Sequence, residues 1–363
     1  MNIKIKELLN RCTTKQLVLC LFTVISLLVF AGLTVFAEGK KDALLDQQAA
    51  ARWSGDGSTA QISCYFTKGN AIDSNKIMEF RYYIDTLLQE ASITSEKENA
   101  RLYIDAYSSS GSITIASEKA SLECQAIGTG GDFFFFHPVQ LINGSYFSGS
   151  DIMDDFVLID ENMAWQLFGS NDIVGMTVVI KNVPHMIAGV YRQEEGRFWE
   201  AAGLSENLVF VSDASLSAYG ETDGILYYET VMPNPVKSFA YSSIKEKFGF
   251  DETKMYVVDN TRRYSLEPLL IVLSDFGIRS MQNAAIQFPY WENYARGYED
   301  VFALLLFFQA IFLLIPALII LMAVITAFRK RTWSIRSIGR FLIDKAGVAK
   351  QRIMDTKSKW KHF

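Results

Sequence analysis

Few residues in this chain have the type and spacing that catalysis requires. The sequence contains three histidines, His137, His185 and His362, and none stands in an HExxH motif or beside a cysteine at zinc-site spacing. The segment from Gly169 to Gly175 faintly suggests a phosphate-binding loop, but Met176 follows it where a Walker A motif has lysine. We therefore expect no catalytic residue, no cofactor and no ATPase in this chain.

An acidic cluster near the middle of the chain has the residue type that binds calcium. It lacks both the spacing and the central glycine of an EF-hand loop, so we expect a solvated loop and a helix cap rather than a metal site. The cluster consists of Asp151, Asp154, Asp155, Asp160 and Glu161.

Two cysteines, Cys64 and Cys124, fall on separate predicted strands. A disulfide between them would close a loop of about 60 residues and contribute ~4 kcal/mol in the chain-entropy model. The alternative is a pair of buried free thiols that pack as small hydrophobic groups. The sequence leaves both arrangements open.

Two uncharged runs determine how these residues are placed. Leu17 to Ala37 is 21 residues long and Val301 to Phe328 is 28 residues long, and about 20 apolar residues span a bilayer. Net charges of +3 on residues 1–16 and +9 on residues 329–363 leave −17 for the rest of the chain. The positive-inside rule then predicts two transmembrane helices, with both termini cytoplasmic and residues 38–300 outside.

Alternatives exist for the first of these runs, and specific contacts are expected for the second. Val35-Phe36-Ala37 would permit cleavage of a signal peptide, but the apolar run is longer than such peptides usually have, which favours a retained anchor. Gln309 lies deep in the second run, where a polar side chain usually faces another helix. Pro316 is the expected kink, and we expect both residues to take part in helix packing.

Residues 38–300 show the periodicities of an α+β (mixed α/β) domain. Two β–α–β halves flank a β-rich inserted subdomain at about residues 141–204. The aromatic run Phe133 to Phe136 is expected to be buried rather than to form a ligand surface. The expected strands are 60–66, 101–107, 112–116, 121–127, 156–159, 178–180, 186–190, 207–211, 225–232 and 254–258, with a turn at 108–111 and a four-residue turn at 181–184. The expected helices are 75–91, 161–168, a short helix from Asp213, 235–248 and 266–287.

The basic tail after residue 328 has one amphipathic segment. Ile335, Ile338 and Leu342 recur at helical spacing, and Arg336 and Arg340 lie on the other face. Such a helix is suited to docking on a cytosolic subunit. The alternative is a basic helix that lies on anionic lipid, which this composition supports without a partner.

The order of residues between Leu141 and Tyr191 resembles the exterior domain of MacB-type ABC transporter permeases, within the FtsX-like permease family. The matching positions are Leu141, Gly144, Phe147, Asp151, Val157-Leu158-Ile159, Ala164, Phe168-Gly169, Ile173-Val174-Gly175 and Gly189-Val190. The resemblance implies a bacterial cell-membrane protein that works with an ABC ATPase and further permease subunits. Members of that family add two spans after the second, so we expect a chain that is not a self-sufficient permease.

The sequence is consistent with two alternative functions. The first is a membrane subunit or accessory protein of a MacB-like ABC-type system, whose exterior domain is moved by a partner ATPase. The second is a stand-alone anchored scaffold or sensor, whose exterior domain binds a peptide, lipid or envelope protein. For both functions we expect membrane lipid as a partner and no nucleic acid. Both functions also leave open whether the chain forms a homo-oligomer.

Overall fold

The computed structural model describes residues 13–94, 100–149, 151, 153–251, 253–279 and 286–330. Its contacts divide the chain into two units, Val35–Phe307 and the segments Met1–Thr34 with Phe308–Phe363. The tail residues predicted to dock on a cytosolic subunit lie outside the described residues. They are Ile335, Arg336, Ile338, Arg340 and Leu342.

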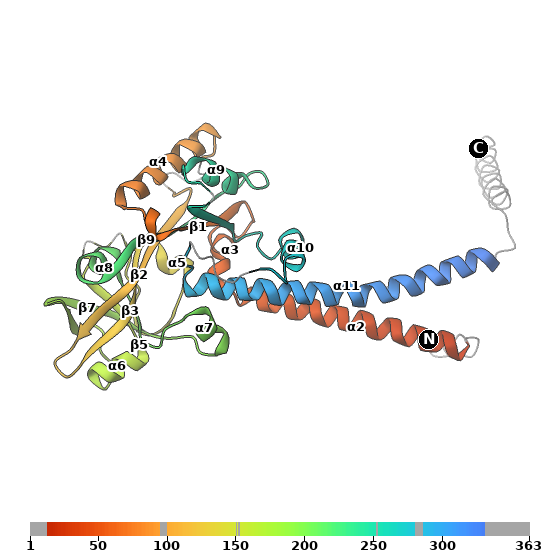
Figure 1. Cartoon of the computed structure of the whole chain (residues 1–363), viewed down its shortest axis with the longest axis horizontal. Coiled ribbons are helices and arrows are strands. Elements are labelled where there is room, and N and C mark those ends of the chain that lie inside the picture. The colour runs from red at the N-terminus through yellow and green to blue at the C-terminus, as the bar shows by residue number, and fades with distance from the viewer. Residues whose placement is uncertain are drawn as a thin grey trace, which may run out of the picture. The chain divides into compact units, whose positions relative to one another are not determined.

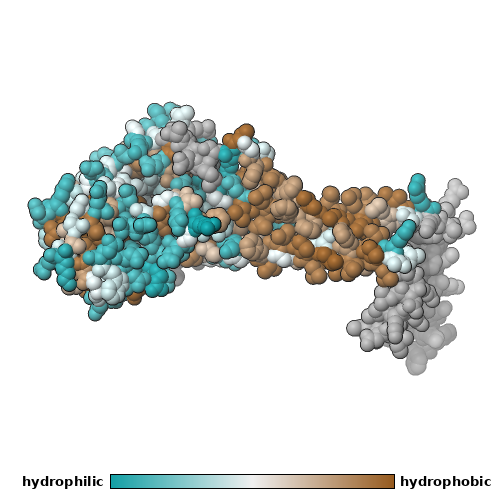
Figure 2. All heavy atoms as spheres, turned by 60° about the horizontal axis from the view of Figure 1, so that its bottom comes forward, coloured by the Kyte–Doolittle hydropathy of each residue, from teal (hydrophilic) through white to brown (hydrophobic). Residues whose placement is uncertain are grey.

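Two helices among the described residues are long and apolar enough to cross a membrane. They are α2 (Thr14–Asp42) and α11 (Tyr290–Lys330), and each contains one of the uncharged runs. Figure 2 shows apolar side chains along both helices, whereas hydrophilic side chains gather over the unit formed by residues 35–307. Pro316 lies within α11, which continues through it. The Gln309 amide, predicted to face another helix, donates a 3.1 Å hydrogen bond to Thr34 Oγ1 of α2.

The unit Val35–Phe307, called the exterior unit from here on, is built on one mixed sheet (Figure 1). Its strand order is β10-β1-β9-β2-β3-β8-β5-β7-β4, with β6 beside β2 and β7. The β3–β8 and β5–β7 pairs are parallel and the others antiparallel. The strands are β1 Thr59–Phe66, β2 Ile104–Ala116, β3 Ser121–Gly131, β4 Gln140–Gly144, β5 Phe156–Asp160, β6 Thr177–Ile180, β7 Val183–Arg192, β8 Leu208–Ser212, β9 Glu221–Pro233 and β10 Met255–Asp259.

Short helices connect and cover these strands. α4 and α9 lie side by side (Figure 1), and the ring of Phe80 on α4 stacks on Phe248 after α9 at 3.7 Å. The aromatic run from Phe133 to Phe136 forms α5, and three of its four rings are buried. The helices are η1 Leu45–Gln47, α3 Ala49–Ser54, η2 Lys68–Asn70, α4 Ser74–Glu90, α5 Phe133–Phe136, α6 Glu161–Phe168, α7 Arg197–Ala202, α8 Asp213–Tyr219, α9 Phe239–Lys247 and α10 Leu266–Ser274.

The stretch predicted as an inserted subdomain joins the main sheet. Its strands β5, β7 and β4 continue the sheet beyond β8, and β6 pairs with both β7 and β2. Strands β5, β6 and β7 share a second hydrophobic core with β2, β3 and β8, and this core includes Val157, Leu167, Val178 and Ile187. Two cores therefore lie along one continuous sheet.

Local signals placed helix α6 correctly. Asp160 accepts a 2.9 Å hydrogen bond from the Asn162 amide as its N-cap, and Gly169 ends the helix at φ 77°. The next turn is shorter than predicted. Lys181 and Asn182 have φ values of 43° and 70°, as in a two-residue primed hairpin turn. Val183 therefore begins β7, and the four-residue turn was wrong.

Two further expectations were wrong. The predicted turn at Ser108–Gly111 is part of β2, because these residues stay paired with β3. A side chain at Gly111 would place its Cβ 2.1 Å from the Glu221 carbonyl oxygen, so glycine there permits close pairing with β9. The helix predicted over 266–287 ends at Ser274.

Of the two arrangements that the sequence left open for Cys64 and Cys124, the structure has the free thiols. Both side chains are buried free thiols in the described structure. Cys64 lies on β1 and Cys124 on β3, and strands β9 and β2 separate them. Three inter-strand steps of about 4.8 Å put their Cα atoms roughly 14 Å apart, about twice the reach of a disulfide.

Candidate functional site

A network of buried and half-buried polar side chains joins the segment after α2 and the start of α11 to the sheet of the exterior unit. The segment after α2 supplies Asp46 and Gln47, and the loop after β10 supplies Asn260 and Arg263. The first turns of α11 supply Glu292 and Glu299. We call this set the junction network. Its other members are Ser63, Tyr65, His137, Glu229, Arg279 and Asp300.

Arg263 is the centre of the network on the α11 side. Its guanidinium donates two hydrogen bonds to Glu292, at 2.6 and 2.7 Å, and one of 2.5 Å to Glu299. The side chains of Arg263 and Glu292 are 2% and 0% exposed. Burial by itself lowers the pKa of Arg263, but the carboxylates of Glu292 and Glu299 outweigh it and raise that pKa well above its usual value.

Further hydrogen bonds tie this ion pair to its surroundings. Gln47 Oε1 accepts from Arg263 at 3.2 Å, which connects the segment after α2 to the start of α11. The hydroxyl of Tyr65, on β1, donates to Glu292 at 2.9 Å. Three elements distant in the sequence therefore meet at one guanidinium–carboxylate pair.

His137 is the centre of the network on the sheet side. Its two ring nitrogens contact Asp46, at 3.0 Å, and Glu229 of β9. Its ring also lies against Trp291 of α11, with centroids 4.4 Å apart. Burial alone lowers the pKa of His137, but the charges and hydrogen bonds of Glu229 and Asp46 outweigh it and raise the pKa to about 9. The histidine is therefore a buried cation at neutral pH.

Two short polar side chains join these two centres. Ser63 donates to Glu229 at 2.5 Å and accepts from the Asn260 amide at 2.7 Å. Asn260 Oδ1 in turn accepts from Arg263 at 3.3 Å. A continuous path of hydrogen bonds therefore runs from Asp46 through the sheet to α11.

The network ends at a second arginine. Arg279, in the segment after α10, contacts both Glu299 and Asp300. Glu299 thus lies between Arg263 and Arg279, and the positive charges of both arginines offset its burial. Each carboxylate of the network is matched by donors of the protein, so the arrangement holds distant elements of the chain together.

The acidic residues weighed as a calcium site have separate structural roles. Asp160 caps α6, and Asp151 accepts from the Ser148 amide at 2.8 Å. Glu161 contacts Arg192 at 3.1 Å. Among the described residues, no group of three or more histidine, cysteine and acidic side chains could hold a metal ion.

The sequence analysis did not identify the junction network. One usable signal was Glu229, a charged residue in the apolar strand sequence ILYYETVM. A second was the seven-residue spacing of Glu292 and Glu299, which puts both on one helical face. The partners of these residues are up to 227 positions away in the chain, and no local pattern specifies them.

Comparison with known proteins gives three kinds of likeness. A sequence model described as the MacB-like periplasmic core domain matches residues 21–238. A 74-residue segment is 35% identical to the macrolide export ATP-binding/permease protein MacB of Chromobacterium violaceum. That segment covers 20% of this chain and 12% of the relative, so the match spans about an eighth of the relative's length.

Solved structures of low sequence identity also resemble this chain. The periplasmic region of MacB from Actinobacillus actinomycetemcomitans is 14% identical, with a TM-score of 0.39, and the match covers 63% of this chain and 98% of that one. The extracellular domain of the noncanonic ABC-type transporter YknZ from Gram-positive bacteria is 14% identical, with a TM-score of 0.34, and the match covers 55% and 100%. A domain of a permease-like protein from Porphyromonas gingivalis is 14% identical, with a TM-score of 0.32 and coverage of 56% and 90%.

Proposed function

The chain belongs to the family with a MacB-like periplasmic core domain, and from this premise we propose that it is a membrane subunit or accessory protein of an ABC-type transport or mechanotransmission system. In this proposal a separate ABC ATPase hydrolyses ATP in the cytoplasm. Further permease subunits complete the membrane part, and the exterior domain of this chain moves with its spans.

The proposed orientation places both termini in the cytoplasm of a bacterial cell and residues 38–300 outside. It is supported by Lys15 before the first uncharged run and by Arg329, Lys330 and Arg331 after the second. Excess lysine and arginine beside a span marks its cytoplasmic side. The relative from Chromobacterium violaceum is described as an ATP-binding/permease protein, which supports an ATPase as the partner.

The observation that carries the proposal is the junction network. A domain that is moved by its spans must hold the ends of those spans firmly. Arg263 bonds to Glu292 of α11 and to Gln47 just after α2, and the path continues through Asn260 and Ser63 into the sheet. Removal of one partner from a buried ion pair is strongly destabilising, so this connection resists being pulled apart.

The test is a pull-down of the full chain from native membranes in a mild detergent, with bound proteins identified by mass spectrometry. We expect an ABC ATPase to co-purify and to be lost when the tail after Arg331 is removed. Recovery of the chain alone, with the tail intact, would overturn the proposal.

Two sets of substitutions separate docking from lipid binding by the tail. Serine at Ile335, Ile338 and Leu342 removes the apolar face and should release the ATPase. Glutamine at Arg336 and Arg340 keeps that face and should retain the ATPase while weakening binding to anionic vesicles. The opposite pattern would assign the tail to lipid.

A second candidate function is an anchored scaffold or sensor without an ATPase. One observation favours it, a cavity of about 940 Å³ in the exterior unit, which has the size of a small-molecule site. Recovery of envelope proteins without an ATPase in the same pull-down would support this function.

A further inference from the structure

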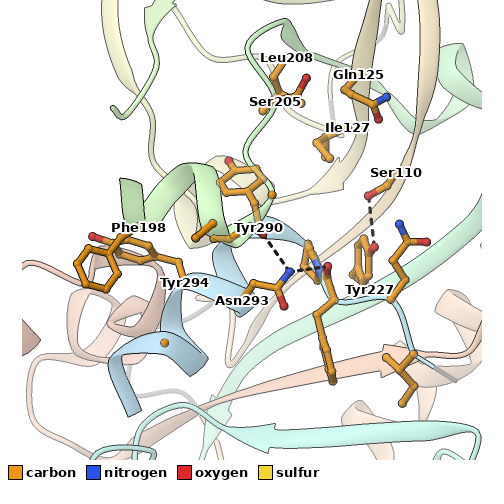
Figure 3. Close-up of a pocket in the computed structure, with 18 of the residues that line it drawn as sticks. Ser110, Gln125, Ile127, Phe198, Ser205, Leu208, Tyr227, Tyr290, Asn293 and Tyr294 are labelled. Atoms are coloured by element: carbon orange, nitrogen blue, oxygen red, sulfur yellow. Dashed lines mark hydrogen bonds between the residues drawn. The ribbon is translucent and has the colours of Figure 1, made fainter. Parts of the chain in front are cut away.

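The cavity of about 940 Å³ lies in the exterior unit between the sheet and two helices (Figure 3). Strands β2, β3 and β9 contribute one side, and α7 and the first turns of α11 contribute the other. Its lining is largely apolar and aromatic, as in sites for small organic ligands. Among the lining residues are Ile127, Phe198, Leu208, Tyr227, Phe288 and Tyr290.

Asn293 lines this cavity and ties its two helices together. Its Nδ2 donates to the carbonyl oxygens of Ala202, at 3.0 Å, and Phe288, at 3.3 Å (Figure 3). These two acceptors fix which atom of the amide is nitrogen. The buried Oδ1 atom has no hydrogen-bond partner in the part of the chain that the structure describes. The same side chain holds the end of α7, at Ala202, against the start of α11 and fixes this wall of the cavity.

The charges around the cavity favour an uncharged ligand. The lining includes one basic residue, Lys68, and one acidic residue, Asp300. Lys68 forms an ion pair with Asp223 at 2.6 Å, and Asp300 contacts Arg279. Each charge is already balanced, so neither an anion nor a cation would find an unpaired counter-charge in the lining.

The cavity adjoins the part of α11 that enters lipid. Gly297, Asp300 and Val301 line it, and the uncharged run of the second span begins at Val301. Phe198, on α7, is 61% exposed and also lines the cavity. Between Val301 and Phe328 this helix has no charged residue. An apolar molecule that leaves the bilayer along α11 would therefore meet no charged side chain of that helix before it reaches the cavity at Asp300.

We propose that this cavity binds an uncharged, lipid-like amphiphile. Its apolar part packs on Phe198, Tyr227 and Phe288. Its polar head faces Gln125 and Ser205, two polar residues of the lining (Figure 3). A monoacylglycerol has this chemistry, with one acyl chain and uncharged hydroxyl groups.

The test is photolabelling of the full chain in phosphatidylcholine nanodiscs. The probe is a monoacylglycerol with a diazirine on its acyl chain, and labelled peptides are mapped by mass spectrometry. We expect labels on residues 197–205 and 290–301, and we expect excess monooleoylglycerol to remove them. An equal effect of phosphatidic acid would overturn the inference of an uncharged ligand.

A matched pair of variants on α7 tests the site itself. Ala201 lines the cavity and is exposed, so Ala201→Trp should obstruct the cavity and leave the core intact. Glu200→Trp adds the same bulk to the preceding residue, which does not line the cavity. We expect Ala201→Trp to lower labelling about tenfold, equivalent to about 1.4 kcal/mol of binding, and Glu200→Trp to leave it unchanged.

Two outcomes would reject the site. One is labelling confined to α2 and to α11 beyond Val301, as for a probe that stays in the bilayer. The other is cavity labelling that Ala201→Trp does not reduce. The competition arm uses the unmodified chain, so the test holds even where a variant folds poorly.

Discussion

Arg263 is a guanidinium whose side chain is 2% exposed and which bonds to two carboxylates. We expect Arg263→Met to lower the free energy of unfolding by about 3–5 kcal/mol, because Glu292 is left buried without its partner. Chemical unfolding of the full chain in detergent, followed by tryptophan fluorescence, measures this change.

The matched control for that substitution is the preceding residue. Arg262 forms a longer ion pair with Glu267, at 3.7 Å, and Glu267 is 72% exposed. Arg262→Met should therefore cost only ~0–1 kcal/mol. Equal losses for Arg262→Met and Arg263→Met would show that burial of the Arg263–Glu292 pair has no energetic consequence.

His137 makes the stability of the exterior unit depend on pH. Its ring is surrounded by Asp46, Glu229, Trp291 and Phe133. Burial by itself lowers the pKa of His137, but the two carboxylates outweigh it and raise that pKa to about 9. A raised pKa in the folded state means that the added stability is complete below about pH 6.5, the unfolded value. It is lost as the pH rises through about 9, a fall on the order of 3 kcal/mol.

The measurement is the unfolding midpoint of the full chain between pH 6 and pH 10. His137→Gln removes the titrating group and should flatten the profile over that range. Glu229→Gln removes the charge that sustains the high pKa and should move the fall to lower pH. A wild-type profile that is flat from about pH 6.5 to 9 would contradict the assigned charge of His137.

At the scale of elements, the sequence predicted structure that depends on local signals better than structure that depends on long-range strand pairing. Helix α6 was predicted to the residue, because Asp160 and Gly169 cap it through contacts within a few positions. The continuity of β2 was missed, because Ser108 to Gly111 resemble a turn and only pairing with β3 and β9 keeps them extended. The state of Cys64 and Cys124 was left open for the same reason, since strand order decides which cysteines are neighbours.

The junction network was missed for a related physical reason. A buried charge is stable only with its partners, and the partners of Glu229 are His137 and Ser63, which lie 92 and 166 positions away. Gln309 was easier to interpret, because a polar side chain within an apolar span has few stable environments. Its contact with Thr34 has the expected kind of partner.

Helix α10 has an apolar face with exposed side chains that could contact lipid. Leu269 is buried with Ala37 and Phe302, which lie at the ends of the two uncharged runs. Leu270 and Ile271 are 50% and 59% exposed. We expect this face to lie in the membrane interface, where exposed apolar side chains are stabilised.

An environment-sensitive label tests the position of α10. The dye NBD, attached at Leu270→Cys in a background without Cys12 and Cys20, should emit at shorter wavelength in nanodiscs than at Met78→Cys. Met78 is 68% exposed on α4 and serves as the solvent reference. Equal emission at the two sites would place α10 in water.

At the scale of the whole molecule, two sets of contacts join elements from the two ends of the chain. The junction network connects the segment after α2, the sheet and the start of α11 within the exterior unit. Within the other unit, Gln309 donates to Thr34 of α2. The two uncharged runs are therefore linked by side chains within the spans, and the segment after α2 and the start of α11 are linked again within the exterior unit. The proposed transmission of movement would use both links.

The Thr34–Gln309 contact also provides a test of how the spans pair. Cysteines at Thr34 and Gln309, in a background without Cys12 and Cys20, should be joined in nanodiscs by a short thiol-to-thiol cross-linker, because the Gln309 amide reaches Thr34 Oγ1 at 3.1 Å. Cysteines at Thr23 and Gln309 should not, since Thr23 lies about 16 Å further along the same helix.

The size of the cross-linked product shows which copies of the helices pair. A cross-linked monomer means that α2 and α11 of one chain pair as in the structure, whereas a covalent dimer means that α11 pairs with α2 of a second copy. A failure of both cysteine pairs to react would show that Gln309 does not face α2 in the membrane.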